Sequence, residues 1–144
     1  MTAARLAMLC LALSLTTLAR TGEAQQSPRA ADLGLREYLA NCARCHETNG
    51  KGDGHYAQFH KIRIPDLTQL SARNNGVFPA ERVREIIDGT RVVILHGTPG
   101  MAVWGDKYKA MAAEDCKAKP CDSAAFIDAR ILALTDYIRT LNSR

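Results

Sequence analysis

The spacing of hydrophobic residues predicts helices joined by long loops, with little or no β-sheet. The clearest helix lies near the C-terminus, where apolar residues recur at intervals of three and four with polar residues between them. These positions are Ile127, Ile131, Leu134, Ile138 and Leu141. Either Asp122 or Ser123 can cap this helix, because each offers a side-chain oxygen to the unpaired N–H groups of a first turn. No stretch alternates at the period of two that a half-buried strand needs.

Further helices are expected upstream. Ser27 and Pro28 suit the start of a helix, as a cap followed by a proline in the first helical position. The apolar positions of this helix are Leu33, Tyr38, Leu39 and Cys42. Pro79 opens a second helix, which Gly89 ends. A short helix is also expected over about 106–113.

The segments between these helices are long and broken by glycine and proline, from His46 to about Val77 and again over 90–105. Long connections without regular structure are unusual in a small domain. A large apolar cofactor inside the fold would explain them, because the loops could then pack on the cofactor.

The N-terminal residues are predicted to be a signal peptide, residues 1–24. A short basic stretch precedes an apolar run from Leu6 to Ala19, which is shorter than the ~20 residues that span a bilayer. Gly22 and Ala24 are small residues in the positions that a signal peptidase reads. Cleavage after Ala24 would leave one domain, residues 25–144, in the periplasm; an uncleaved membrane anchor is the alternative.

Charge and composition exclude one class of function and indicate the compartment. The formal net charge is +4, and no block of basic residues interleaved with aromatic residues suggests nucleic-acid binding. Four cysteines remain after Ala24, in an oxidising compartment, and they form two local pairs. Cys116 and Cys121, with four residues between them, are expected to form a local disulfide.

The other cysteine pair carries the chemistry. Cys42-Ala-Arg-Cys45-His46 is a C-x-x-C-H motif, the attachment signature of haem c. On a helical turn, two thiols at this spacing lie on one face and can each form a thioether with a haem vinyl group. His46 then directs its imidazole to the iron from the same side and is the expected proximal ligand.

The same motif has two other interpretations. A redox-active or structural disulfide between Cys42 and Cys45 would usually occur in a thioredoxin-like βαβ pattern, which this sequence lacks. A zinc site would need further ligands. His55, His60 or the Cys116/Cys121 pair could supply them.

Over residues 28–142 the sequence resembles the class I c-type cytochromes, the bacterial periplasmic monohaem family. Beyond the C-x-x-C-H motif, Gly34, Tyr38 and Cys42 match the N-terminal helix of that family, and Leu134 and Tyr137 match its C-terminal helix. The resemblance implies an all-α cytochrome c fold. Three main helices, one or two short ones and long loops would wrap around one covalently bound haem c.

The resemblance also implies a methionine as the second axial ligand. Met101 lies in Gly-Thr-Pro-Gly-Met-Ala-Val-Trp-Gly, which is similar to the distal loop of the family, although Ala102 stands where relatives often carry proline. His96 is the rival ligand, and His55 and His60 are further candidates. Met111 is expected to serve in packing.

Three supporting residues follow from the same resemblance. The carbonyl of Pro65 would accept the proton on the other nitrogen of the proximal histidine. Trp104 and Arg73 would donate hydrogen bonds to haem propionates. Each residue also has a plainer interpretation, as a turn proline, a core aromatic and a solvated arginine respectively.

The expected function is a monomeric electron carrier that is not an enzyme. Its partners would be redox proteins (a dehydrogenase, oxidase or reductase), with contact to a membrane only through them. A dedicated subunit of such an enzyme is one alternative, with a docking face made of Lys107, Lys109, Lys117 and Lys119. A peroxidase-like enzyme is another, because Ala102 and His96 could leave the distal side of the iron labile.

Overall fold

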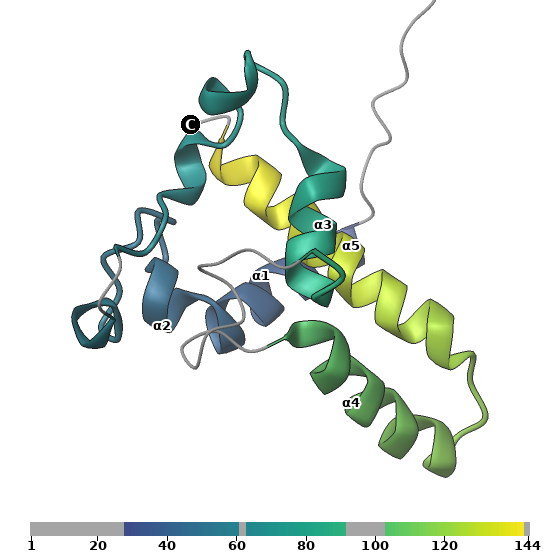
Figure 1. Cartoon of the computed structure of the whole chain (residues 1–144). Helices are drawn as coiled ribbons and strands as arrows, with labels where there is room; N and C mark the ends of the chain where they lie inside the picture. Colours follow the sequence, from purple (N-terminus) through teal and green to yellow (C-terminus); the bar gives the residue numbers. More distant parts are fainter. Residues whose placement is uncertain (1–27, 61–62, 92–102, 143–144) are drawn as a thin grey trace, which may run out of the picture.

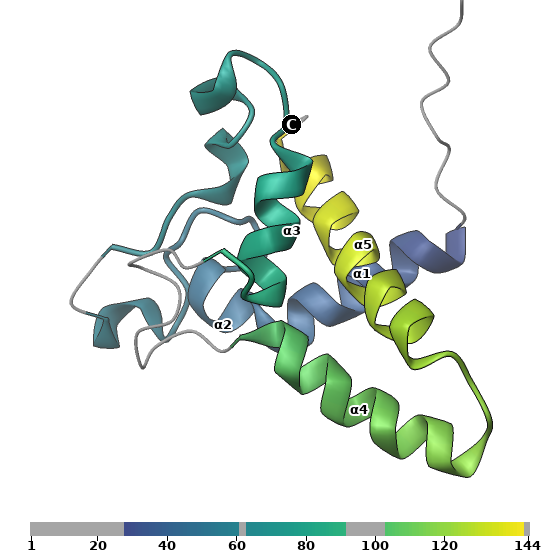
Figure 2. The same cartoon turned by 45° about the vertical axis from the view of Figure 1, so that its right-hand side comes forward.

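The computed structural model describes residues 28–60, 63–91 and 103–142, which form five α-helices and three 3₁₀ turns without a β-strand. The all-α class is therefore confirmed. The α-helices are α1 (Pro28–Asn41), α2 (Ala43–His46), α3 (Ala80–Asp88), α4 (Trp104–Ala118) and α5 (Ser123–Leu141). The 3₁₀ turns are η1 (Ala57–Phe59), η2 (Leu67–Gln69) and η3 (Ala72–Asn74). Figures 1 and 2 show α5 as the central element, with α1, α3 and α4 all packed against it.

The crossing of α1 and α5 depends on Gly34. A Cβ atom on this residue would lie 2.2 Å from the carbonyl oxygen of Ala133, which is closer than real atoms approach, and 3.0 Å from Cβ of Tyr137. The missing side chain therefore lets the two backbones touch. Tyr38 and Tyr137 pack beside this contact, with ring centroids 4.9 Å apart. Residues that match the N-terminal and C-terminal helices of the family, Gly34, Tyr38 and Tyr137, therefore lie where the two helices cross.

The core follows the apolar stripe of α5 more closely than that of α1. Four of the five expected positions of α5 are buried, and Ile127 packs against their edge. On α1 the expected stripe is partly wrong, because Leu39 is 48 % exposed and Leu33 only half-buried. Tyr38 and Cys42 are buried as expected, and Glu37 faces the interior as well.

Helix boundaries agree with the predicted start and stop residues. α1 begins at Pro28, and Asp122 caps α5 by accepting hydrogen bonds from the N–H groups of Ala124 and Ala125 at 2.9 and 3.1 Å. Gly89, with φ of 87°, follows the end of α3. Residues that favour the start or the end of a helix therefore determine where these helices begin and end.

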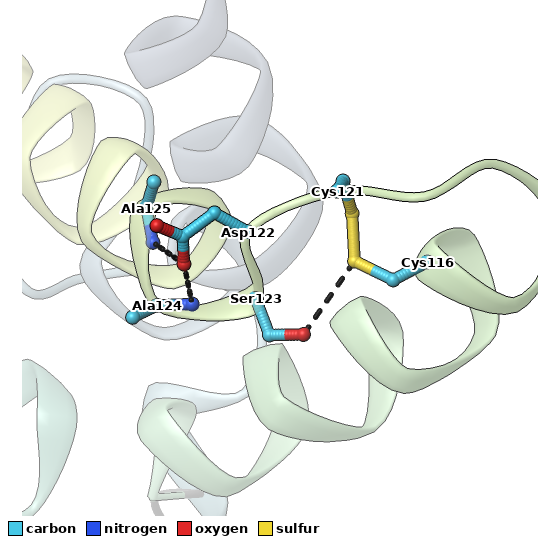
Figure 3. The surroundings of a disulfide bond; sticks show 6 residues. All are labelled: Cys116, Cys121, Asp122, Ser123, Ala124 and Ala125. Carbon is cyan, nitrogen blue, oxygen red and sulfur yellow. Dashed lines mark hydrogen bonds between the residues drawn. A yellow bond between two sulfur atoms is a disulfide. The ribbon is translucent and has the colours of Figure 1, made fainter.

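α4 is longer than the expected segment 106–113. It starts at Trp104 and continues to Ala118. Its first turn packs against the end of α3, where a Cβ on Gly105 would lie 2.3 Å from the carbonyl oxygen of Asp88. The hairpin of α4 and α5 is closed by the pair Cys116 and Cys121, whose sulfur atoms are joined in the structure (Figure 3).

The C-terminal end of α5 holds the long loop in place. The side chain of Asn142 donates to the carbonyl of Leu67 at 2.8 Å and accepts from the N–H of Ser71 at 2.9 Å. The irregular loop is therefore tied to the central helix. None of the helices in the described part of the chain is long and apolar enough to span a membrane.

Replacing Gly34 with alanine should lower the free energy of unfolding by about 1–3 kcal/mol, because the added methyl group would force α1 away from Ala133. Denaturant unfolding of the purified protein would measure the change. Ala31→Val, at an exposed position of the same helix, is the control and should cost no more than about 0.7 kcal/mol. Without the close contact, Gly34→Ala would instead stabilise the helix by about 1 kcal/mol.

Candidate cofactor site

The Cys42–His46 segment continues the helical path of α1 into the interior. Cys42 N–H donates to the carbonyl of Tyr38 at 2.8 Å, and His46 N–H donates to the carbonyl of Cys42 at 2.9 Å. Cys42 is 8 % exposed and His46 5 % exposed, whereas Cys45 is half-buried. The first cysteine and the histidine are thus both directed inward.

Tyr38 and a glycine-rich loop hold this turn. The hydroxyl of Tyr38 donates to the carbonyl of Glu47 at 2.7 Å, at a residue with φ of 60°, where the chain leaves the helical path. The N–H groups of Gly52 and Gly54 then donate to the carbonyls of His46 and Cys45 at 3.0 and 3.1 Å. A Cβ on Gly54 would lie 2.7 Å from a carbonyl oxygen of the turn, so the loop can wrap this closely only because it carries glycine.

A cavity of about 310 Å³ lies beside this turn and has a mainly apolar lining. Cys42 and His46 both contribute to its wall. Other parts of the wall come from η2 and from α3, and Trp104 contributes the start of α4. Concave, mainly apolar sites of this size, with a few polar groups, are typical of cofactor binding.

The ring of His46 is oriented by the loop. Its Nδ1 lies 3.3 Å from the carbonyl oxygen of Pro65, so the predicted contact between these residues is confirmed. A backbone acceptor on one ring nitrogen fixes the tautomer and the orientation of the ring, and it raises the basicity of the other nitrogen. This arrangement suits a metal ligand.

The cavity also contains polar groups that suit an acidic cofactor. Nε1 of Trp104 is buried and has no hydrogen-bond partner among the residues that the structure describes. A buried N–H without an acceptor costs free energy, and Trp104 lines the cavity together with Arg73 and Arg82. Haem fits this set of residues, because it combines a large apolar ring, two carboxylates and vinyl groups within reach of thiols.

The pKa values of the two motif cysteines argue against redox chemistry at the thiols. Burial, followed by the nearby charge of Glu37, raises the pKa of Cys42 to about 12. Burial also raises the pKa of Cys45. A reactive thiol–disulfide pair needs a lowered cysteine pKa. The motif therefore lacks the electrostatics of a thioredoxin-like site.

The zinc interpretation also lacks its ligands. Cys116 and Cys121 are joined to each other, and their hairpin lies at the far end of α4, about 18 Å along that helix from Trp104. Within the described ranges, no three His, Cys, Asp or Glu side chains gather as a metal site. Asp122, not histidine, follows Cys121, so this pair is not a second haem motif.

The expected distal ligand lies outside the described residues. This holds for Met101 and equally for His96 and Ala102. His55 is exposed, and His60 lies 3.9 Å from Sγ of Cys45. Neither of these two histidines is part of the cavity wall. Met111 packs against the hydrophobic core, as expected.

The four lysines of the expected docking face lie along α4 and directly after it. Lys107 and Lys109 are in the first half of the helix, whereas Lys117 is at its end and Lys119 follows it. The docking face stays a prediction. Lys107 also contacts the site, because it lies 4.6 Å from the ring centroid of Trp104 and donates to Oδ1 of Asn41 at 2.6 Å.

Sequence analysis missed Glu37. Its carboxylate is buried between α1, α4 and α5, where it accepts hydrogen bonds from Tyr108 and Asn41 and faces Arg130. One acidic residue in an amphipathic helix is ordinarily solvated, so the sequence carried no sign of this burial. Only the packing of three helices reveals it.

An all-α fold with Cys42 and His46 in the wall of one cavity suits a protein that attaches haem covalently. A family model described as Cytochrome c matches residues 31–142, which is most of the chain. The chain therefore belongs to the cytochrome c family, whose members carry covalently bound haem c and transfer electrons with it. No curated protein and no solved structure matches it.

Trp104→Phe should lower the free energy of unfolding of the haem-loaded protein by about 1.5–3 kcal/mol, the range for a hydrogen bond to a charged acceptor. Trp104→Tyr keeps a donor at the ring edge and should recover part of this loss. Denaturant unfolding followed by absorbance would compare the two variants. Equal stability of the Phe and Tyr variants would mean that the buried N–H of Trp104 has no acceptor in the loaded protein.

Proposed function

We propose that the chain is an exported class I cytochrome that carries one electron on a single haem. Cys42 and Cys45 would form the thioethers, and Nε2 of His46 would ligate the iron. The observation that carries the proposal is that Cys42 and His46 share one cavity, in which Pro65 orients the imidazole and the buried N–H of Trp104 has no acceptor among the described residues. Bound there, the haem would supply an iron that alternates between the ferric and ferrous states.

The residues of the chain have three tasks in this proposal. The apolar side chains of η2 and α3 that line the cavity exclude water from the haem. Trp104 and Arg73 bind the propionates, whose negative charges need paired donors once they leave water. Pro65 holds His46 in one orientation in both oxidation states, so that little rearrangement accompanies electron transfer.

Met101 is proposed as the sixth ligand. It precedes the cavity residue Trp104 by three positions, in a stretch rich in glycine. Met111 packs in the core and is not part of the cavity wall, which leaves Met101 as the candidate methionine of the domain. With both axial positions filled by the protein, the haem would have no open site for a substrate. An electron carrier rather than an enzyme follows from this ligation.

The proposed setting is the periplasm. Residues 1–24 would direct export, and residues 25–144 would be the mature domain, with a disulfide between Cys116 and Cys121 in an oxidising compartment. The domain would act as a monomer and exchange electrons with a dehydrogenase, oxidase or reductase. Membrane contact would occur only through such partners.

Covalent attachment can be tested by replacing the motif cysteines with serine. The exported protein should keep its haem on a denaturing gel stained for haem, and Cys42→Ser/Cys45→Ser should lose the stain. The control is Cys116→Ser/Cys121→Ser, which should keep full staining and lose only about 2 kcal/mol of stability for its short loop. Staining that depends on Cys116 and Cys121 instead would overturn the assignment.

The sixth ligand can be tested with Met101→Ala. The wild-type ferric protein should show the weak near-infrared absorption band of sulfur-to-iron ligation, and the variant should lose it. Met111→Leu is the matched control and should keep the band. The variant should also bind carbon monoxide rapidly in the ferrous state, because one axial position becomes accessible.

Two results would contradict methionine ligation. A wild-type spectrum without the band, unchanged in Met101→Ala but altered in His96→Ala, would assign the ligand to His96. Rapid binding of carbon monoxide to the ferrous wild-type protein at neutral pH would indicate a labile distal side, as in a peroxidase-like enzyme.

A further inference from the structure

Glu37 is an acidic residue enclosed by three helices. It is 9 % exposed. One carboxylate oxygen accepts hydrogen bonds from the hydroxyl of Tyr108 and from Nδ2 of Asn41, both at 2.9 Å. The other oxygen lies 3.3 Å from Nε of Arg130. The carboxylate thus draws its partners from α1, α4 and α5.

The attraction between Glu37 and Arg130 is mainly electrostatic. Nε of Arg130 is buried and makes no well-directed hydrogen bond, even though Glu37 lies within ion-pair distance. The guanidinium group also stacks on the ring of Phe126 at 3.8 Å. A buried carboxylate without a cation would be strongly unfavourable. Each residue therefore stabilises the charged form of the other. Their fields act over a long range because little water screens them.

Several contacts connect this ion pair to the proposed haem site. Asn41, which donates to Glu37, directly precedes Cys42 in the chain. Tyr108 belongs to the same buried cluster as Cys42, and its ring centroid is 6.5 Å from that of Trp104 in the cavity wall. Through Asn41 and Tyr108, the carboxylate of Glu37 is thus connected to Cys42 and to Trp104 of the cavity wall.

The field of Glu37 reaches the first attachment cysteine. After burial, the charge of Glu37 is the largest contribution that raises the pKa of the Cys42 thiol. A negative charge that disfavours a thiolate at this sulfur will equally favour a more positive group bound to it. The ferric haem carries one more positive charge than the ferrous haem.

We propose that the buried pair Glu37–Arg130 sets the reduction potential of the haem, with Glu37 lowering it and Arg130 raising it. This inference rests on the proposed function, since it requires a haem attached at Cys42. Reduction adds one electron to the iron and no proton to either residue. The pair acts only through its fields, which stabilise the two oxidation states unequally.

The midpoint potential of the haem-loaded protein tests the proposal, because removing Glu37 and removing Arg130 should shift this potential in opposite directions. Glu37→Gln removes the negative charge and keeps an oxygen for Tyr108. It should change the one-electron equilibrium about tenfold in favour of the ferrous state, equivalent to a rise of ~59 mV. Arg130→Met removes the positive charge at similar volume and should shift the potential downward. The double variant should return close to the wild-type value, because the two field effects cancel.

Controls separate this effect from loosened packing. Asp106→Asn removes a carboxylate that is 74 % exposed on the first turn of α4, and it should leave the potential nearly unchanged because water screens it. A purely structural pair would shift the potential in the same direction in both single variants, through greater exposure of the haem to water. Same-sign shifts, or no shift in either variant, would overturn the proposal.

A further variant covers the case in which Glu37→Gln does not fold. Tyr108→Phe keeps the carboxylate and removes one of its donors, so the negative field is less compensated and the potential should fall. A rise or no change in Tyr108→Phe would count against the proposal. Failure of the proposed function would be distinct, since the wild-type protein would then lack a reversible one-electron wave.

Discussion

The contact between α1 and α5 at Gly34 determines where the chemistry of this protein lies. The two backbones touch there, which brings Tyr38 into the core beside Tyr137. The hydroxyl of Tyr38 in turn holds the carbonyl of Glu47, at the end of the Cys42–His46 turn. Because Gly34 has no side chain, α5 packs directly on α1, and through Tyr38 and Glu47 this packing determines where His46 faces the cavity. Any residue larger than glycine would move the whole motif relative to its wall.

Burial of polar groups organises the site as much as apolar packing does. Nδ1 of His46 lies beside the carbonyl of Pro65, and Glu37 is bound by Tyr108, Asn41 and Arg130, whereas Nε1 of Trp104 has no partner among the described residues. The first two arrangements are complete, and the third still needs an acceptor. We propose that the haem carboxylates supply that acceptor. In the same low-polarity surroundings, the charge of Glu37 would act on the attachment side.

Local patterns predicted the parts of the molecule that local interactions determine. Pro28, Asp122 and Gly89 mark helix ends by backbone chemistry alone, and the stripe of α5 is buried because one face of a regular helix meets the core. The sequence predicts too short a helix for α4, because the contact of α4 with α3 through Gly105 leaves no periodic pattern of hydrophobic residues. On α1, the apolar Leu39 is exposed and the acidic Glu37 is buried, which is the reverse of what their polarity predicts. Whether each of them is buried depends on which helices from other parts of the chain pack against α1. A single sequence does not specify that packing.

We propose that haem is held by the Cys42–His46 turn, and proteolysis of the exported protein followed by mass spectrometry of the peptides is the most direct test. The peptide containing Cys42, Cys45 and His46 should carry the mass of one haem. The peptides containing Cys116 and Cys121 should be linked to each other without haem. Unmodified cysteines in the Cys42–His46 peptide, or haem on the Cys116–Cys121 segment, would show that haem is not held by this turn.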